Sequence, residues 1–178
     1  MNRSKKYALN RTKFLSEDER IYFEGLCRRR LATEDNRDAL LMLLGLYTGG
    51  RAQELLNICK NDFSKKDQTV FLRGIKGSND REIPIPGWLA DAVAGYIKHA
   101  DPTTLLFPIQ YTRLRQIWNL WRPVPKVFHA LRHTFAIRTY EKTKDVRLLQ
   151  VAMGHRSILN TMIYVDYMYS TQEMRRIL

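Results

Sequence analysis

The sequence predicts a mainly α-helical fold with one small antiparallel β-sheet, an α+β class. Two observations favour it: apolar residues recur at helical spacing over most of the 178 residues, and only residues 69–85 carry short β-rich runs. Apolar residues make up 44% of the chain, enough for a single core. The sequence contains no repeat and no Gly/Ser linker, so we expect a basic N-terminal arm, residues 1–14, and one domain, residues 15–178.

Three helices are expected in the first third of the chain. Ser16 followed by Glu19 is a capping-box pattern that starts the first of them. Gly49 and Gly50 stop the second, and the third begins directly afterwards, so Arg51 is expected at a junction between helices. The expected ranges are 16–30, 36–47 and 52–59.

Residues 69–85 change character and predict a hairpin. TVFLRGI and REIPIP are β-rich runs separated by the polar loop KGSND, with Lys76 at the turn. Helical patterns then resume, interrupted by prolines, and the last helix carries Tyr164. The expected helices are 88–98, 111–121, 128–141, 145–153 and 157–167, and residues 168–178 form a tail.

The charge indicates a polyanionic partner. Lys and Arg number 30 against 18 Asp and Glu, a net charge of +12. The longest apolar run, residues 39–47, is far shorter than the roughly 20 residues that cross a bilayer, so we expect no membrane contact. The amino terminus lacks the apolar stretch of a secretory signal, and Cys27 and Cys59 form no CxxC pair. A cytoplasmic location with free thiols is therefore expected.

A metal site is the first chemical hypothesis to consider, because His129 and His133 have the i, i+4 spacing of zinc ligands. Ala130 stands where the HExxH pattern needs its glutamate, and no cysteine is near enough to complete a zinc motif. The sequence also has no GxxxxGK[ST] and no GxGxxG motif. We therefore expect no metal and no nucleotide cofactor.

The remaining candidates are cations and imidazoles followed by a tyrosine. Singly, each has a simpler explanation, such as a solvated charge or a half-buried aromatic ring. Together they lie in the segments TGGRAQELLNI, IKGSNDREIPIP, HALRHTFA and MGHRSILNTMIYV. In order and spacing these segments resemble the tyrosine recombinases, the phage integrase family, over about residues 15–167. The candidate catalytic residues are Arg51, Lys76, His129, Arg132, His155 and Tyr164.

The resemblance implies the catalytic-domain fold of that family and a covalent mechanism. Tyr164 would attack a DNA phosphorus and form a 3′-phosphotyrosyl link, which keeps the phosphodiester energy and needs neither metal nor ATP. Arg51 and Arg132 would bind the non-bridging oxygens, because guanidinium forks match phosphate geometry. Tyr167 and Tyr169 are rivals on distance alone, but only Tyr164 has the family offset from the GH motif.

The resemblance assigns supporting roles as well. His155 would add a hydrogen bond to the phosphate, His129 would assist proton movement near the tyrosine, and Lys76 would protonate the departing 5′ oxygen. His133 is expected to make a packing or supporting contact, since it points about 100° away from its neighbour on the helix. Glu54 either orients an arginine through an ion pair or is a solvated charge.

The sequence departs from the family in having only a short basic leader before the catalytic region, as in the fimbrial switch invertases. Most members carry a further helical domain there, and the two domains form a clamp around DNA. Site recognition would then depend on a DNA-bending or helper protein, or on tight packing of protomers. The leader's cations, candidates for phosphate contacts, are Arg3, Lys5, Lys6, Arg11 and Lys13.

The function implied is site-specific recombination, by integration, excision or inversion, in a protein of bacterial or phage origin. The expected partner is double-stranded DNA, on which the chain acts as a homotetramer at paired sites, and the tail at 168–178 docks on a neighbouring protomer or folds back on its own chain. One alternative is a type IB topoisomerase-like enzyme that nicks and reseals without exchanging partners. The other is a DNA-binding regulator without turnover.

Overall fold

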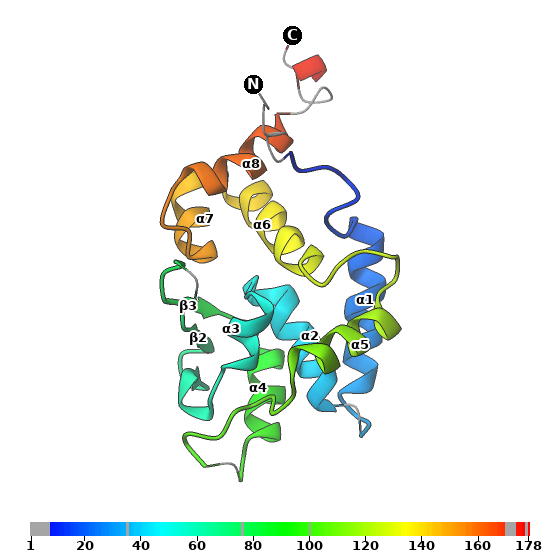
Figure 1. The fold of residues 1–178 in the computed structure, drawn as a ribbon, viewed down its shortest axis with the longest axis vertical. Coiled ribbons are helices and arrows are strands. Elements are labelled where there is room, and N and C mark those ends of the chain that lie inside the picture. Colours follow the sequence, from blue (N-terminus) through cyan, green and yellow to red (C-terminus); the bar gives the residue numbers. More distant parts are fainter. Residues whose placement is uncertain (1–7, 35, 76, 100, 170–173, 177) are drawn as a thin grey trace.

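The chain folds into a bundle of helices with a small sheet along one side (Figure 1). The computed structural model describes all residues except 1–7, 35, 76, 100, 170–173 and 177. The helices are α1 (Glu17–Arg30), α2 (Asn36–Thr48), α3 (Ala52–Leu56), α4 (Gly87–Tyr96), α5 (Tyr111–Trp121), α6 (Ala130–Thr143), α7 (Val146–Met153) and α8 (Leu159–Met168), with a 3₁₀ turn η1 (Lys60–Asp62). The strands are β1 (Phe63–Ser64), β2 (Thr69–Leu72) and β3 (Arg81–Pro84).

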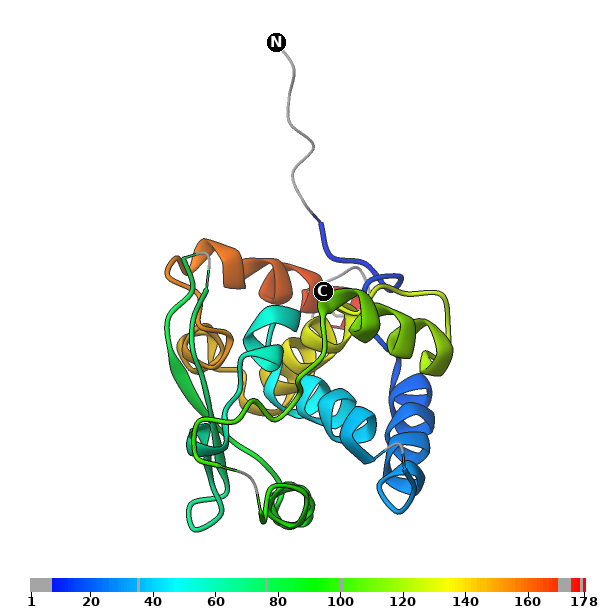
Figure 2. The same ribbon diagram turned by 60° about the horizontal axis from the view of Figure 1, so that its bottom comes forward.

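Helix α2 is the centre of the main core. It is apolar on almost every side and packs against α1, α4 and α6, as Figures 1 and 2 show. Such an all-round apolar helix is stable only when other elements enclose it. A second apolar cluster lies between α6, α7 and α8 and contains Tyr164. The two clusters meet along α6.

The capping box predicted for the first helix is confirmed. The Ser16 hydroxyl accepts from the Glu19 amide at 3.3 Å, and the Glu19 carboxylate accepts from the Ser16 amide at 2.9 Å. The predicted mainly helical fold with a small antiparallel sheet is also confirmed. The predicted helix 111–121 matches α5, and the boundaries of the other predicted helices agree to within two residues, except at the end of α3.

The predicted hairpin is present but belongs to a sheet of order β1-β2-β3. Strands β2 and β3 pair antiparallel with Val70 opposite Ile83 and Leu72 opposite Arg81. The sequence did not predict β1, two residues that pair with the start of β2. The alternation along β3 buries Arg81 and Ile83 on the same inward face.

The third helix is shorter than predicted, because it ends at Leu56 and not at Cys59. The backbone beyond Asn57 pairs with residues 102–106 instead: the Lys60 amide donates to the Thr104 carbonyl at 3.1 Å, and Leu106 donates to Ile58 at 2.8 Å. This pairing satisfies backbone groups that a further helical turn would have used.

Residues 8–14 lie against α6 and α8. Leu9 is buried in the second cluster, and the Phe14 ring packs edge-on against Tyr167 with centroids 5.2 Å apart. The Lys126 ammonium donates to the Phe14 carbonyl at 2.7 Å. Three of the predicted DNA contacts, Arg3, Lys5 and Lys6, lie outside the described residues, and so does part of the tail. Over the described ranges, no helix has the length and apolarity to cross a membrane.

Candidate active site

A hollow of about 500 Å³ is lined by residues at the start of α3, at the start of α6, directly after α7 and on α8. Its wall contains five of the six predicted catalytic residues, whereas Lys76 lies outside the described residues. The lining residues are Arg51, His129, Arg132, His133, His155, Leu159, Asn160, Ile163 and Tyr164. The structure therefore brings together groups spread over more than 110 positions of sequence.

Two left-handed glycines place residues at the hollow. Gly49, with φ +61°, ends α2, and a Cβ there would lie 2.4 Å from the Phe135 ring. The chain turns at this point and Arg51 becomes the N-cap of α3. Gly154, with φ +65°, caps α7 and presents His155 directly afterwards.

Arg132 is the most deeply fixed cation of the site. Its side chain is 2% exposed, and its guanidinium donates to the Gly49 and Met153 carbonyls, each at 2.6 Å. It also lies 3.1 Å from Nε2 of His155. Burial, followed by the charges of Arg51 and Arg81, lowers the pKa of Arg132 to about 9, so it remains protonated at neutral pH.

Glu54 is a buried carboxylate at the back of the site, which makes it an ion-pair partner and not a solvated charge. It accepts from Arg51 Nη1 at 3.0 Å, from the Arg51 amide at 2.8 Å and from Arg81 Nη2 at 2.7 Å. The Ser78 hydroxyl donates to it at 2.8 Å. Burial alone would raise the pKa of Glu54, but the hydrogen bond and charge of Arg81 outweigh it and lower the pKa to about 2.

The charges of this cluster do not balance. Three guanidinium groups, those of Arg51, Arg81 and Arg132, surround the single carboxylate of Glu54 at distances of 3.0, 2.7 and 3.9 Å. The cluster therefore has a net charge of +2 in a site whose members are largely buried. Such an excess is costly without an anion, so the cluster is suited to bind one.

His155 is held on both ring nitrogens. Nε2 faces Arg132, and Nδ1 lies 2.9 Å from the hydroxyl of Thr161 on α8. Burial, with the neighbouring charge of Arg132, lowers the pKa of His155 to about 3, so the ring is neutral at pH 7. A guanidinium only donates, so Nε2 of the neutral ring accepts from Arg132 and Nδ1–H donates to Thr161. A hydrogen bond from His155 to an anion in the hollow requires the other tautomer, with the proton on Nε2.

Tyr164 lies on the α8 side of the hollow and is 2% exposed. Its hydroxyl is 3.0 Å from Nδ1 of His133, so the supporting contact expected of His133 is made with the tyrosine itself. Burial first, and the charges of His129 and Arg132 next, lower the pKa of His133 to about 3. The His129 ring packs edge-on against His133 at 4.7 Å, and desolvation with the charge of Arg132 lowers its pKa to about 4.

The two rival tyrosines lie elsewhere on or beyond α8. Tyr167 packs against Phe14, and Tyr169 is 55% exposed at the end of the helix. Neither lines the hollow, whereas Tyr164 does.

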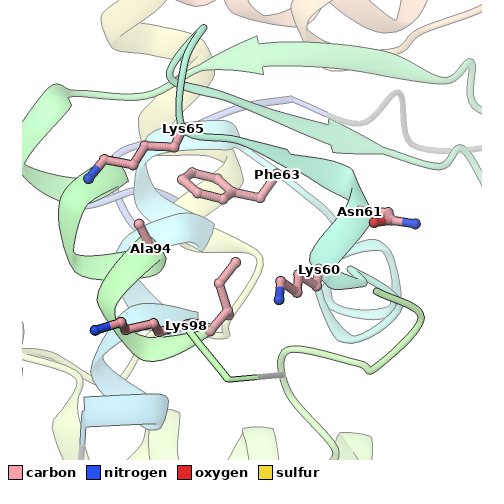
Figure 3. A pocket seen from close by; sticks show the side chains of 7 residues that line it. Lys60, Asn61, Phe63, Lys65, Ala94 and Lys98 are labelled. Atoms are coloured by element: carbon pink, nitrogen blue, oxygen red, sulfur yellow. The ribbon is translucent and has the colours of Figure 1, made fainter. Parts of the chain in front are cut away.

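A second hollow, of about 350 Å³, lies between η1, β1 and α4 (Figure 3). Its floor is the Phe63 ring, which faces Ala94 of α4, and three lysines surround it. Of the predicted catalytic residues that the structure describes, none lines it. No group of three or more His, Cys, Asp or Glu placed to hold a metal ion occurs among the residues the structure describes.

Sequence reasoning missed three residues that support the site. Thr161 binds His155, and Ser78 and Arg81 bind Glu54. One signal was available for Arg81, because in a strand it shares a face with Ile83, two residues on, and that face must be inward. Ser78 lies in a polar loop, and no periodic pattern identifies a loop hydroxyl as buried.

Comparison with known proteins adds family relationships to this geometry. The model of the phage integrase family matches residues 13–170. Tyrosine recombinase XerA of Thermococcus onnurineus is 30% identical over 159 residues, which cover 80% of this chain and 56% of that protein. XerA of Pyrococcus horikoshii is 32% identical over 167 residues, covering 85% and 56%. The chain thus spans little more than half the length of these curated relatives.

Solved structures show the same fold. A crystal structure of XerA recombinase superposes with a TM-score of 0.69 at 23% identity, covering 94% of this chain and 66% of that one. XerH recombinase bound to a palindromic difH substrate, a post-cleavage complex, gives 0.72 at 23% identity, covering 93% and 52%. The catalytic domain of bacteriophage HP1 integrase gives 0.66 at 22% identity, with 90% of each chain covered.

Proposed function

The chain belongs to the phage integrase family, and from this premise we propose that it breaks and rejoins double-stranded DNA in site-specific recombination, using Tyr164 as the nucleophile. One observation carries the proposal: a single hollow holds Tyr164 beside an excess of fixed positive charge. Integration, excision and inversion share this chemistry.

Cleavage proceeds by one displacement at phosphorus. The Tyr164 oxygen forms a bond to the 3′-side phosphorus, the bond to the 5′ oxygen breaks, and the tyrosine loses its proton. Neutral His133, 3.0 Å from the hydroxyl, supports removal of that proton, and His129 assists from beside it. Rejoining is the same step reversed, with the free 5′ hydroxyl as nucleophile.

Arg51, Arg132 and His155 bind the phosphate. Negative charge builds on the non-bridging oxygens in the transition state, and prefixed cations stabilise it without reorganising. Arg132 meets this condition through its bonds to the Gly49 and Met153 carbonyls, and Arg51 through Glu54. Loss of one such donor is expected to slow cleavage by about 10²- to 10³-fold.

Lys76 is the proposed general acid for the departing 5′ oxygen. Its neighbours in the chain are anchored, since Ser78 donates to Glu54 and accepts from the Ile75 amide at 3.0 Å. This anchoring supports a role for the loop close to Arg51.

DNA binding outside the hollow is assigned to the arm, residues 1–14, through Arg3, Lys5, Lys6, Arg11 and Lys13, while residues 15–178 form the catalytic domain. The tetramer on paired sites, docking of the tail on a neighbouring protomer and an accessory protein are further parts of the proposal. The net charge of +12 supports a DNA partner. A cytoplasmic location stays a prediction.

Covalent trapping tests the proposal. The protein is incubated with nicked duplexes tiled from DNA that flanks its own gene, and adducts are separated on denaturing gels. The wild type and Tyr169→Phe, the same change at an exposed tyrosine, should form an adduct that Tyr164→Phe lacks. Salt-sensitive binding without any adduct would favour the regulator, and nicking without strand exchange between paired sites would favour the topoisomerase-like alternative.

A further inference from the structure

Arg81 is an interior arginine that does not line the hollow. It is the first residue of β3, and its side chain is 2% exposed. A guanidinium in such a place needs an opposite charge and hydrogen-bond acceptors around it, because its desolvation is costly. The acceptors that Arg81 uses lie on two separate parts of the site.

One end of the Arg81 guanidinium binds Glu54, the carboxylate that holds Arg51. Nη2 of Arg81 lies 2.7 Å from Oε2 of Glu54. The same oxygen accepts from the Arg51 amide at 2.8 Å, and Oε1 accepts from Arg51 Nη1 at 3.0 Å. The position of the carboxylate, and with it that of Arg51, therefore depends on Arg81.

The other side of the Arg81 guanidinium binds the turn that ends α7. Nε of Arg81 donates to the Ala152 carbonyl at 2.9 Å, and the next carbonyl, that of Met153, accepts from Arg132 at 2.6 Å. Gly154 packs directly on the arginine, since a Cβ there would lie 2.9 Å from Arg81 Nη1. Arg81 and Arg132 thus bind consecutive carbonyls of the turn that leads to His155.

We propose that Arg81 is a positioning residue: by bridging Glu54 and the Ala152–Gly154 turn, it makes Arg51, Arg132 and His155 converge on one phosphate. This inference rests on the proposed function. A lysine could not replace it, because an ammonium group is a single point of charge, whereas the guanidinium fork reaches acceptors on two sides. A misplacement of about 1 Å in such a site costs about 10²-fold in rate.

The test compares Arg81→Lys with the wild type in single-turnover adduct formation at saturating protein. Two substrates are used: the natural phosphodiester, and a methylphosphonate at the scissile position, which lacks the charge that the cations neutralise. Arg51→Ala shows what loss of a phosphate contact does on each substrate. Arg73→Lys is the matched control, the same change at a hairpin arginine whose side chain is 51% exposed.

We expect Arg81→Lys to slow adduct formation about 10- to 100-fold on the phosphodiester, with DNA affinity within about threefold of wild type. On the methylphosphonate the defect of Arg81→Lys should shrink, and so should that of Arg51→Ala. A purely structural role would slow both substrates equally, and that result would overturn the inference. Arg73→Lys should match the wild type on both.

Melting midpoints establish that the compared proteins are folded, and Arg81→Gln, which keeps a donor for one acceptor, is the second variant. Loss of the fold in both variants would count against the inference, since Arg81 would then act on the whole domain. No adduct from the wild type on any duplex would refute the proposed function and this inference with it. An adduct that Arg81→Lys forms at the wild-type rate would refute this inference alone.

Discussion

Replacing Glu54 with glutamine removes one negative charge from the interior and leaves the side-chain shape almost unchanged. The Glu54 side chain is 0% exposed, and its two oxygens accept from Arg51, Ser78 and Arg81. The single oxygen of a glutamine amide cannot serve all of these donors, and its NH₂ group would face some of them. The three arginines would also lose the carboxylate that they share.

The expected loss of stability in Glu54→Gln follows from the burial of its ion-pair partners. Removing one partner of a buried ion pair costs about 3–5 kcal/mol, and Arg81, with a 2% exposed side chain, is such a partner. Arg51 is about one third exposed, so its pair with Glu54 is screened and adds little. We expect Glu54→Gln to lower the free energy of unfolding by about 3–5 kcal/mol, which lowers the melting temperature by about 6–20 °C in a domain of this size.

Urea unfolding followed by circular dichroism at pH 7 measures this loss. Asp91→Asn is the control, because its pair with Lys65 at 3.3 Å is 71% and 65% exposed and should contribute less than about 1 kcal/mol. The pKa of Glu54 is lowered to about 2, so its stabilisation is complete above pH 4.5 and is lost as the pH falls toward 2. A difference of less than about 1 kcal/mol between the free energies of unfolding of Glu54→Gln and the wild type at pH 7 would contradict the role of the buried ion pair.

Three further predictions follow from the same geometry. His133 and His155 have pKa values lowered to about 3 by burial, so the folded state loses stability as the pH falls below 6.5. Urea unfolding should show a free energy of unfolding about 2–3 kcal/mol smaller at pH 5.5 than at pH 7.5. Equal free energies at the two pH values would contradict the buried neutral rings. Gly154→Ala should lower the free energy of unfolding by about 1–3 kcal/mol, because φ is +65° and the new Cβ meets the Asn79 carbonyl at 2.8 Å. Gly95→Ala is the control in the same assay: it lies in α4 with open space around the new Cβ, so it should be neutral or stabilise by up to about 1 kcal/mol. DNA affinity measured by anisotropy should fall with salt, log K losing about 0.9 per neutralised phosphate for each decade, and a flat response would argue against a phosphate-binding surface.

Local rules predicted much of the fold because local contacts decide it. The capping box at Ser16 and Glu19 closes within one turn, and so its pattern is readable in the sequence. The end of α3 could not be predicted from the local sequence, because the backbone after Asn57 pairs with residues more than 40 positions away. Propensity favoured a longer helix, and tertiary pairing prevailed.

For the candidate site, too, local motifs predicted some features and long-range contacts decided the others. Arg51, His129, Arg132, His155 and Tyr164 were predicted from motifs, and the structure gathers them in one hollow. The contacts that hold them come from residues whose role depends on distant partners, such as Arg81 with Glu54, 27 positions apart.

His133 shows what helical geometry alone could and could not give. Its place on the helix predicted a packing or supporting contact, but the identity of its partner, Tyr164, depends on where α8 packs.

The central claim is that Tyr164 forms the covalent bond to DNA, and mapping the trapped adduct tests it most directly. The wild-type adduct is digested with a protease and a nuclease, and the peptide that carries the residual nucleotide is identified by mass spectrometry. The account predicts the modification on Tyr164, which lines the hollow beside Arg132 and His155. A modification on Tyr167, Tyr169 or any other residue would contradict it.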